Sequence, residues 1–137
     1  MKKVISVFLC IVILLSIAVT AYANDTVAPC SNNVYATDIY FAISSSGKAT
    51  ASYAYNGKSG LIKSAKIVTK VQKKFGFIWI TVDNGSWTDT STAVNYSNSH
   101  SVQLSKTGTY RAHVEFTISG SGGSDDKITL DLEKKYG

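Results

Sequence analysis

The sequence predicts an all-β protein, an antiparallel β-sandwich of about seven or eight strands behind an N-terminal signal peptide. From residue 34 onward, apolar side chains recur at every second position, which is the period of a strand with one buried face. Runs of Ser, Gly, Asn and Asp divide this region into short segments, as turns between strands do. No segment there shows the 3.6-residue period of an amphipathic helix. A closed barrel of similar strand number is the alternative architecture.

The N-terminus has the layout of a secretory signal peptide. Lys2 and Lys3 are followed by an apolar run over residues 4–19 and by the small-x-small pattern Ala21-Tyr22-Ala23. We expect cleavage after Ala23 and therefore a secreted, extracellular protein; the alternative is an uncleaved segment that anchors the chain. The predicted organisation is a signal peptide (1–23), a flexible lead-in (24–33) and a β-sandwich domain (34–137).

The mature chain is mildly basic and holds a single cysteine. The net charge of the whole chain is +5, and loss of Lys2 and Lys3 with the signal peptide lowers it to +3. This charge fits anionic partners such as envelope polymers or lipid headgroups. Nucleic acid is not an expected partner, since Arg111 is the only arginine. Cys30 has no internal disulfide partner after cleavage and is either a free thiol or part of an intermolecular bridge.

Three strands are predicted in the first half of the domain. In residues 35–43 the odd positions, beginning with Tyr35, are expected to face the core. Residues 49–55 alternate in the same way after a serine-rich turn. In residues 61–74, Ala65 starts an inward row and Lys66 an outward one.

The middle of the domain is predicted as a hairpin followed by edge segments. Residues 77–82 are the expected hairpin partner of the third strand, and Trp79 is a candidate for a central core tryptophan. Asp83-Asn84-Gly85-Ser86 is a strong turn signal. Residues 87–94, rich in Ser and Thr, then form a separate edge strand, and a short strand follows at residues 102–104.

The last two predicted strands cover residues 109–119 and 128–132, and the first of them begins with a distinctive tyrosine. Tyr110 follows Leu104 and lies close to Gly108 at the start of its strand. This pattern resembles the tyrosine corner of immunoglobulin-like and fibronectin-like sandwiches, in which the tyrosine hydroxyl bonds to upstream backbone. Ala112 stands where the immunoglobulin pattern has a cysteine, so the disulfide of antibody domains is absent. The resemblance implies an immunoglobulin-like sandwich; the alternative is a core tyrosine in another sandwich.

The arrangement also resembles a group of uncharacterised small secreted proteins of Gram-positive bacteria. The matching features are a signal peptide, the turn Gln72-Lys73-Lys74, a tryptophan soon after it (Trp79) and the strand start Gly108-Thr109-Tyr110-Arg111. The likeness covers most of the mature chain, but its motifs are short and structural. It implies an extracellular β-sandwich and brings no catalytic residue.

Two sets of residues are candidate contacts with a partner. Lys66, Lys70 and Lys74 form a row on the outward face of one strand and could meet an anionic surface. The alternative is that these lysines protect an exposed strand from edge-to-edge pairing. Trp87 and Tyr96 lie in a polar stretch, where exposed aromatic rings stack on sugars or dominate a contact surface. The alternative is packing in the core or at a strand edge.

No residue pattern predicts catalysis, a metal or a cofactor. His113 is expected on an outward strand face and His100 in a polar loop, without the ordered partners of a triad or zinc site. The acidic groups at 125–126, and at 83–84 with Asp89, are better explained as turn formers than as calcium ligands. We therefore expect a protein that is not an enzyme.

These observations predict a secreted, non-catalytic β-sandwich protein that binds the cell envelope or another extracellular partner. The expected partner is an anionic cell-envelope polymer or a surface protein, with membrane contact but no spanning segment after cleavage. Two other function classes remain as alternatives: a small membrane-active toxin or bacteriocin-like effector, and a secreted enzyme with an unrecognised site.

Overall fold

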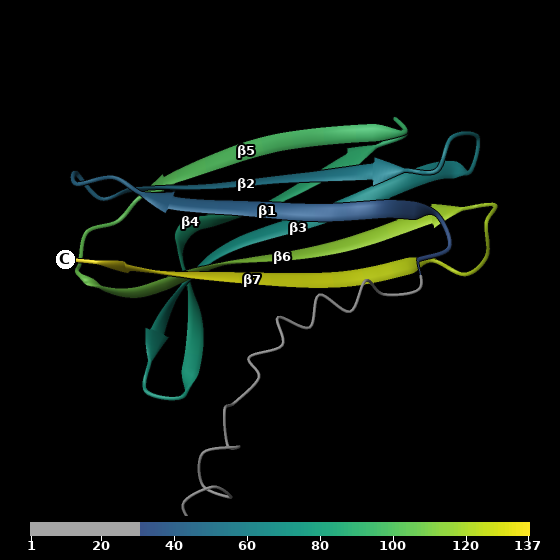
Figure 1. Ribbon diagram of the computed structural model, residues 1–137. Helices are drawn as coiled ribbons and strands as arrows, with labels where there is room; N and C mark the ends of the chain where they lie inside the picture. Colours follow the sequence, from purple (N-terminus) through teal and green to yellow (C-terminus); the bar gives the residue numbers. More distant parts are fainter. Residues whose placement is uncertain (1–30) are drawn as a thin grey trace, which may run out of the picture.

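The computed structural model describes residues 31–137, which form a two-layer antiparallel β-sandwich (Figure 1). The predicted signal peptide, most of the predicted lead-in and Cys30 lie outside the described residues. The strands are β1 (Val34–Ile43), β2 (Lys48–Gly57), β3 (Ile62–Phe75), β4 (Ile78–Ser91), β5 (Asn95–Gln103), β6 (Gly108–Gly120) and β7 (Asp126–Tyr136).

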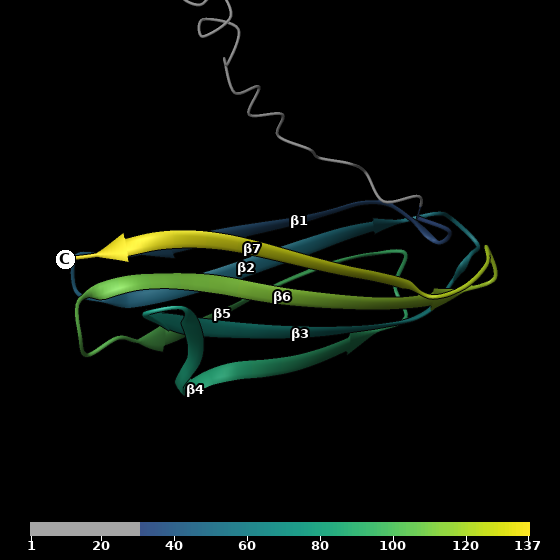
Figure 2. The same cartoon turned by 90° about the horizontal axis from the view of Figure 1, so that it is seen from below.

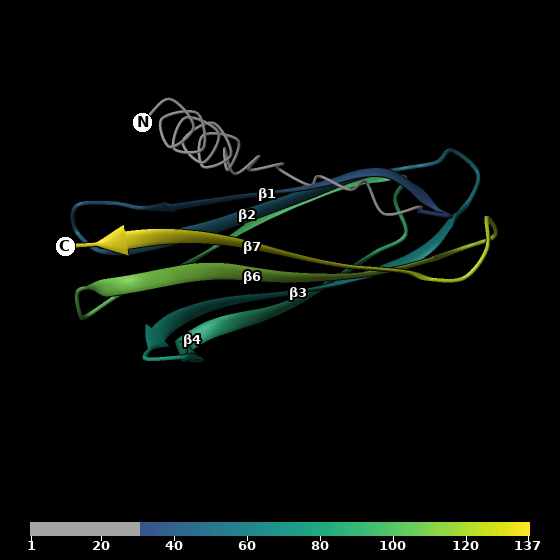
Figure 3. The ribbon, with the colours of Figure 1, turned by 60° about the horizontal axis from the view of Figure 1, so that its bottom comes forward.

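One sheet has the order β1-β2-β5 and the other the order β4-β3-β6-β7. Every neighbouring pair is antiparallel. The two layers are seen edge-on in Figure 3, where β4 lies at one rim of the four-stranded sheet. The predicted fold class, an all-β antiparallel sandwich, is confirmed. Residues 31–137 contain no helix that could cross a membrane.

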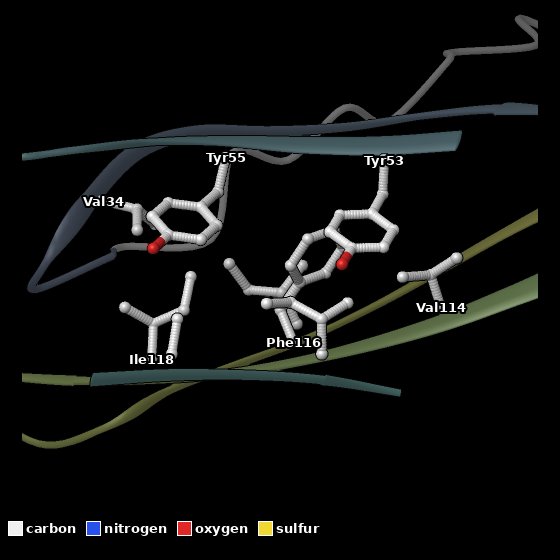
Figure 4. Close-up of a cluster of buried hydrophobic side chains, with 9 residues drawn as sticks. Val34, Tyr53, Tyr55, Val114, Phe116 and Ile118 are labelled. Atoms are coloured by element: carbon white, nitrogen blue, oxygen red, sulfur yellow. The ribbon is translucent and has the colours of Figure 1, made fainter. Parts of the chain in front are cut away.

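The core fills the space between the sheets with side chains from the predicted inward rows. Figure 4 shows Tyr53 and Tyr55 extending from β2 toward Phe116 and Ile118 of β6. A second cluster, which includes Phe41 and Tyr110, continues this layer. The alternation predicted for β2, β3 and β6 is therefore the one observed.

Tyr110 makes the hydrogen bond expected of a tyrosine corner. Its ring is buried, and its hydroxyl donates to the carbonyl oxygen of Lys106 at 2.5 Å. Burial, together with the nearby Tyr136, raises the pKa of the Tyr110 hydroxyl, so it remains a donor at neutral pH. This bond fixes the loop that carries the chain from β5 in one sheet to β6 in the other.

Tyr110→Phe is expected to lower the free energy of unfolding by about 1 kcal/mol, because one hydrogen bond is lost while the ring stays packed. Urea denaturation followed by circular dichroism measures the change. Tyr40→Phe is the matched control, since Tyr40 is 63% exposed and no hydrogen bond of its hydroxyl is seen within residues 31–137. Equal stabilities of the two variants would contradict a structural role for the hydroxyl.

The first strand begins with a register shift that the sequence pattern did not reveal. Tyr35, predicted to be inward, is 68% exposed, and Val34 takes the buried position instead. The β1–β2 pairing shifts between Val34 and Ala36, and such a bulge reverses the faces of the residues before it. The alternation from Ile39 onward follows the prediction because it lies beyond the bulge.

The start of β1 is fastened to the beginning of β7. The Asp126 carboxylate accepts hydrogen bonds from the backbone N–H groups of Asn32 and Asn33, both at 2.7 Å, and of Val34 at 3.1 Å. The fully buried Asn33 side chain donates to the carbonyl oxygen of Ser124 and accepts from the N–H of Gly122. These bonds connect a strand of one sheet to a strand of the other.

The expected turn at residues 83–86 is instead a bulge inside one long strand. Lys70 pairs with Ser86 and Gln72 with Thr81, so Val71 alone opposes four residues of β4. Asn84 adopts a left-handed conformation with φ of 58°. Asn-Gly supplies that conformation in a hairpin turn and in a bulge alike, which is why the sequence signal was misread. The bulge makes the predicted strands 77–82 and 87–94 parts of β4, which ends at Ser91.

Candidate functional site

Trp87 and Tyr96 lie at the seam between β4 and β5, the edge strands of the two sheets. Trp87 faces inward and stacks on His100, with ring centroids 4.9 Å apart and planes 7° from parallel. Tyr96 packs against Tyr53 and Tyr55, each at 6.2 Å between centroids. Both candidate contact residues are half-buried and hold the sandwich edge together, which is the packing alternative foreseen for them.

His100 belongs to β5 rather than to a loop, and it shares a carboxylate with two other side chains. Asp89 of β4 accepts from the Tyr53 hydroxyl at 2.6 Å and from the Asn98 amide at 3.2 Å. The third partner of this carboxylate is His100 Nε2, at 2.5 Å. The predicted short strand at residues 102–104 covers only the end of β5, because the rest of β5 alternates polar residues with few apolar ones.

The Asp89 carboxylate is stabilised as a charged group inside the seam. Burial alone would raise its pKa, but the hydrogen bonds from Tyr53 and His100 outweigh burial and hold the pKa below its usual value. Burial and the neighbouring carboxylate raise the pKa of the Tyr53 hydroxyl far above its usual value. Tyr53 is therefore a permanent donor. These groups form a closed structural network that spans the two sheets.

The outward face of the four-stranded sheet carries a second network of charges. Lys70 pairs with Glu115 at 3.1 Å, and His113 lies between Glu115 at 2.9 Å and Asp131 at 2.7 Å. The hydrogen bonds from Lys70 and His113 lower the pKa of the Glu115 carboxyl. His113 is on the outward face, as predicted. Most of the charge on this face is thus neutralised by neighbours.

The three lysines of the predicted row have different environments in the structure. Lys66 is exposed, Lys70 is ion-paired, and Lys74 lies on the hairpin beyond the bulge. Edge protection does not explain the row, because β3 is an inner strand paired with both β4 and β6. Of the three lysines, only Lys74 belongs to the part of the β3–β4 hairpin that lies beyond the bulge.

The end of the β3–β4 hairpin, residues 72–82, leaves the body of the sandwich. Figure 1 shows this projecting hairpin below the four-stranded sheet, on the side away from the three-stranded sheet. Figure 2, which views the molecule from that side, shows the same hairpin in front of the strands. Bulges bend strands, so the residues extruded opposite Val71 explain the change of direction. β3 pairs with β6 only as far as Lys73, and beyond it the two hairpin strands pair only with each other.

The projecting hairpin carries most of the exposed large apolar side chains of residues 31–137. Phe77 at its tip is fully exposed, at 104% of the reference area. Phe75 and Ile78 are directly opposite each other in the pairing, and Ile80 is next along the same face; these three are 50%, 59% and 47% exposed. Contiguous exposed apolar surface of this kind marks an interaction site.

Trp79 occupies the opposite face of the hairpin, so its prediction as a core tryptophan is wrong. The Arg111 guanidinium lies over its ring at 4.5 Å, and the Lys74 ammonium at 5.5 Å. Arg111 is held in place because it donates to the side-chain oxygen of Gln72 at 2.8 Å. The tryptophan therefore contacts two cations and belongs to neither core cluster.

The charge on the projecting hairpin is exclusively positive. Residues 72–82 include Lys73 and Lys74 and no acidic residue. Lys73 lies over the rings of Phe75 and Tyr110, at 5.3 and 5.6 Å from their centroids. The register places Lys134 and Lys135 beside Tyr110 and Thr109, at the same end of the sheet. Lysines thus lie next to the apolar tip, on the side of the sheet.

One feature of the sequence indicates this site, although the prediction did not include it. The run Phe75 to Ile80 is apolar on both faces of the hairpin, whereas a strand that covers one core alternates. The turn signal at residues 83–86 made this run look like an ordinary sheet hairpin. The four apolar residues of the tip were consequently assigned to the fold and not to a surface.

The described part of the chain contains no group of three or more His, Cys, Asp or Glu residues that could hold a metal ion. Asp126 is occupied by backbone N–H groups, and Asp89 faces the seam while Asp83 is exposed on the bulge. No known protein family, curated protein or solved structure matches the chain. Its function must therefore be argued from these surfaces alone.

Proposed function

We propose that this chain is a secreted, non-catalytic binding protein that attaches to an anionic surface of the cell envelope. The single observation that carries the proposal is the projecting hairpin, on which exposed apolar side chains and lysines occur together without any acidic residue. Anionic polymers and lipid headgroups are the surfaces that such a charge pattern attracts. The mature net charge of +3, after loss of Lys2 and Lys3, acts in the same direction.

The proposal includes an immunoglobulin-like or fibronectin-like classification of the sandwich. It is supported by the order β1-β2-β5 against β4-β3-β6-β7 and by the Tyr110 hydrogen bond at the start of β6. It assigns the contact role to Lys73 and Lys74 in place of Trp87 and Tyr96, which pack at the seam.

The test is cosedimentation of residues 24–137 with isolated cell walls and with anionic vesicles. This part of the chain retains all seven strands and both core clusters, so it contains what the fold needs. Binding that weakens between low and high salt supports the proposal, because screening reduces attraction between exposed charges. Absence of binding to both materials would contradict it.

Lys73→Gln with Lys74→Gln is expected to weaken binding about tenfold or more, since each lysine near an anionic surface contributes about 1 kcal/mol. Lys63→Gln with Lys66→Gln is the matched control, because it removes the same charge from exposed positions outside the hairpin. The affinities come from titration at fixed salt. An equal loss in both double variants would show that net charge alone acts, and not the hairpin.

A further inference from the structure

We propose that the anionic surface is a lipid bilayer and that the tip of the projecting hairpin inserts into its outer layer. The inference rests on the proposed function and names the partner for the same site. Phe75, Phe77 and Ile78 enter the apolar region, while Lys73 and Lys74, which lie farther from the tip, contact the headgroups.

The apolar side chains of the tip have no partner within residues 31–137 that removes them from water. Phe77 is fully exposed, and Phe75 with Ile78 forms a cross-strand pair at half exposure or more. A polymer of charged sugars or phosphates would satisfy the lysines but would leave these side chains in water. A bilayer satisfies both, because its apolar interior lies directly beneath a charged layer.

The order of residues along the hairpin matches the layers of a membrane surface. Phe77 lies at the tip, the pair Phe75 and Ile78 follows, and Lys74 lies opposite Trp79 at the next level. Lys73 lies one level farther from the tip, opposite Ile80. Tryptophan is enriched at the boundary between headgroups and acyl chains, and lysine extends its ammonium into the headgroup layer. Trp79 also has the Arg111 guanidinium over its ring, and that guanidinium is held by Gln72 and by an ion pair with Asp131.

A hollow of about 230 Å³ at the base of the hairpin adds to this arrangement. It lies between the hairpin and the β5–β6 loop, and Lys73 and Lys106 both line it. The nearest acidic group is Asp83, which also lines the hollow. Two lysines and one aspartate therefore line the hollow, which leaves a net positive charge beside the apolar tip.

The hairpin is long enough to anchor in one leaflet and too short to cross. Lys73 and Phe75 are two positions apart on β3, which is roughly 7 Å at the usual rise of a strand, and the turn at Gly76 and Phe77 follows directly. The hydrocarbon core of a bilayer is about 30 Å thick. We therefore expect attachment without leakage, which separates this inference from a membrane-active toxin.

The first arm of the test is Phe77→Ser in residues 24–137, titrated with vesicles of phosphatidylglycerol and phosphatidylcholine. Loss of one inserted phenylalanine is expected to weaken binding about tenfold to a hundredfold. Thermal stability should be unchanged, because the side chain is fully exposed. Tyr40→Ser removes an exposed aromatic ring from the other sheet and should bind as the parent does.

The second arm measures depth. In a Trp87→Phe background, Trp79 is the only tryptophan, and its fluorescence should be quenched by lipids brominated on their acyl chains. Quenching together with the Phe77→Ser loss and no release of trapped dye supports insertion into one leaflet. Dye release would overturn that geometry.

Failure of the inference and failure of the proposed function give different results. Salt-sensitive binding to vesicles or walls, with no quenching and no effect of Phe77→Ser, would overturn insertion while leaving envelope attachment standing. No binding to either material would overturn both. If Phe77→Ser instead abolished self-association in sedimentation, the tip would be an interface with a second copy, and insertion would be wrong.

Discussion

Asp126→Ala is expected to lower the free energy of unfolding by about 3–5 kcal/mol, the largest single-site loss that we expect. The carboxylate is 5% exposed and accepts from three successive backbone N–H groups, those of Asn32, Asn33 and Val34. A charge-assisted hydrogen bond contributes about 1.5–3 kcal/mol, and a buried donor left without a partner costs about 1–3 kcal/mol. Alanine removes the acceptor and leaves all three donors behind.

The location of these bonds increases the effect. They attach the start of β1, in the three-stranded sheet, to the start of β7, in the four-stranded sheet. Loss of the carboxylate also frees the Asn33 backbone, which Asp126 holds in place. The hydrogen bonds of the buried Asn33 side chain to Ser124 and Gly122 are then weakened as well. We therefore expect β1 to detach first when the variant is heated.

Chemical denaturation of the parent and the variant measures the difference, and hydrogen exchange localises it to β1. Asp125→Ala is the matched control, because Asp125 is the exposed neighbour of the same residue type. The control should stay within about 0.5 kcal/mol of the parent. Similar stabilities for the two variants would show that the three backbone bonds contribute little.

The parts of the fold that the sequence predicted are those governed by alternation. In β2, β3 and β6 each inward residue is apolar or small, so a period of two identifies both the strand and its buried face. Tyr110 was recognisable because its function depends on a local pattern beside Gly108. These features need no knowledge of distant neighbours.

The parts that the sequence did not predict depend on contacts between distant strands. β5 is mostly polar, and it is a strand because it pairs with β2 along its whole length. Asp89 and His100 meet only once two sheets bring β4 and β5 together at the seam. An isolated sequence shows these residues as an unremarkable acid and a loop histidine.

The candidate site was missed for a related reason. Asp83-Asn84-Gly85-Ser86 has the chemistry of a tight turn, and only the pairing of Lys70 with Ser86 shows that the strand continues through it. The bulge changes the direction of the hairpin (Figure 1), and Phe77 at its turn is fully exposed. The same residues in a straight hairpin would extend the sheet, and no apolar tip would project from the sandwich.

Asp89→Asn is expected to lower the free energy of unfolding at pH 7 by about 2–3 kcal/mol. The carboxylate accepts from Tyr53, Asn98 and His100, and it is 16% exposed. The amide of asparagine replaces one acceptor oxygen with a donor that faces other donors, so at least one buried bond is lost and another is weakened.

The variant should also change how stability depends on pH. The pKa of Asp89 is lowered in the folded chain, because hydrogen bonds to the carboxylate outweigh the effect of burial. Its contribution is therefore fully present above the unfolded-state pKa of about 3.9 and is lost as the pH falls through the lower folded-state value. The parent should lose stability below about pH 4, and Asp89→Asn should lose less over the same interval. Glu115, whose pKa is also lowered, keeps some acid sensitivity in both proteins.

Urea titrations between pH 7 and pH 2 test both statements, with Asp38→Asn as a control that removes the same charge from an exposed site on β1. The control should follow the parent curve. Tyr53→Phe provides the decisive comparison, because Tyr53 and Asp89 share one hydrogen bond. The losses in Tyr53→Phe and Asp89→Asn should add to more than the loss in the double variant, since the shared bond is removed in each. Strict additivity would mean that the hydrogen bond between Tyr53 and Asp89 contributes no coupling energy to the seam.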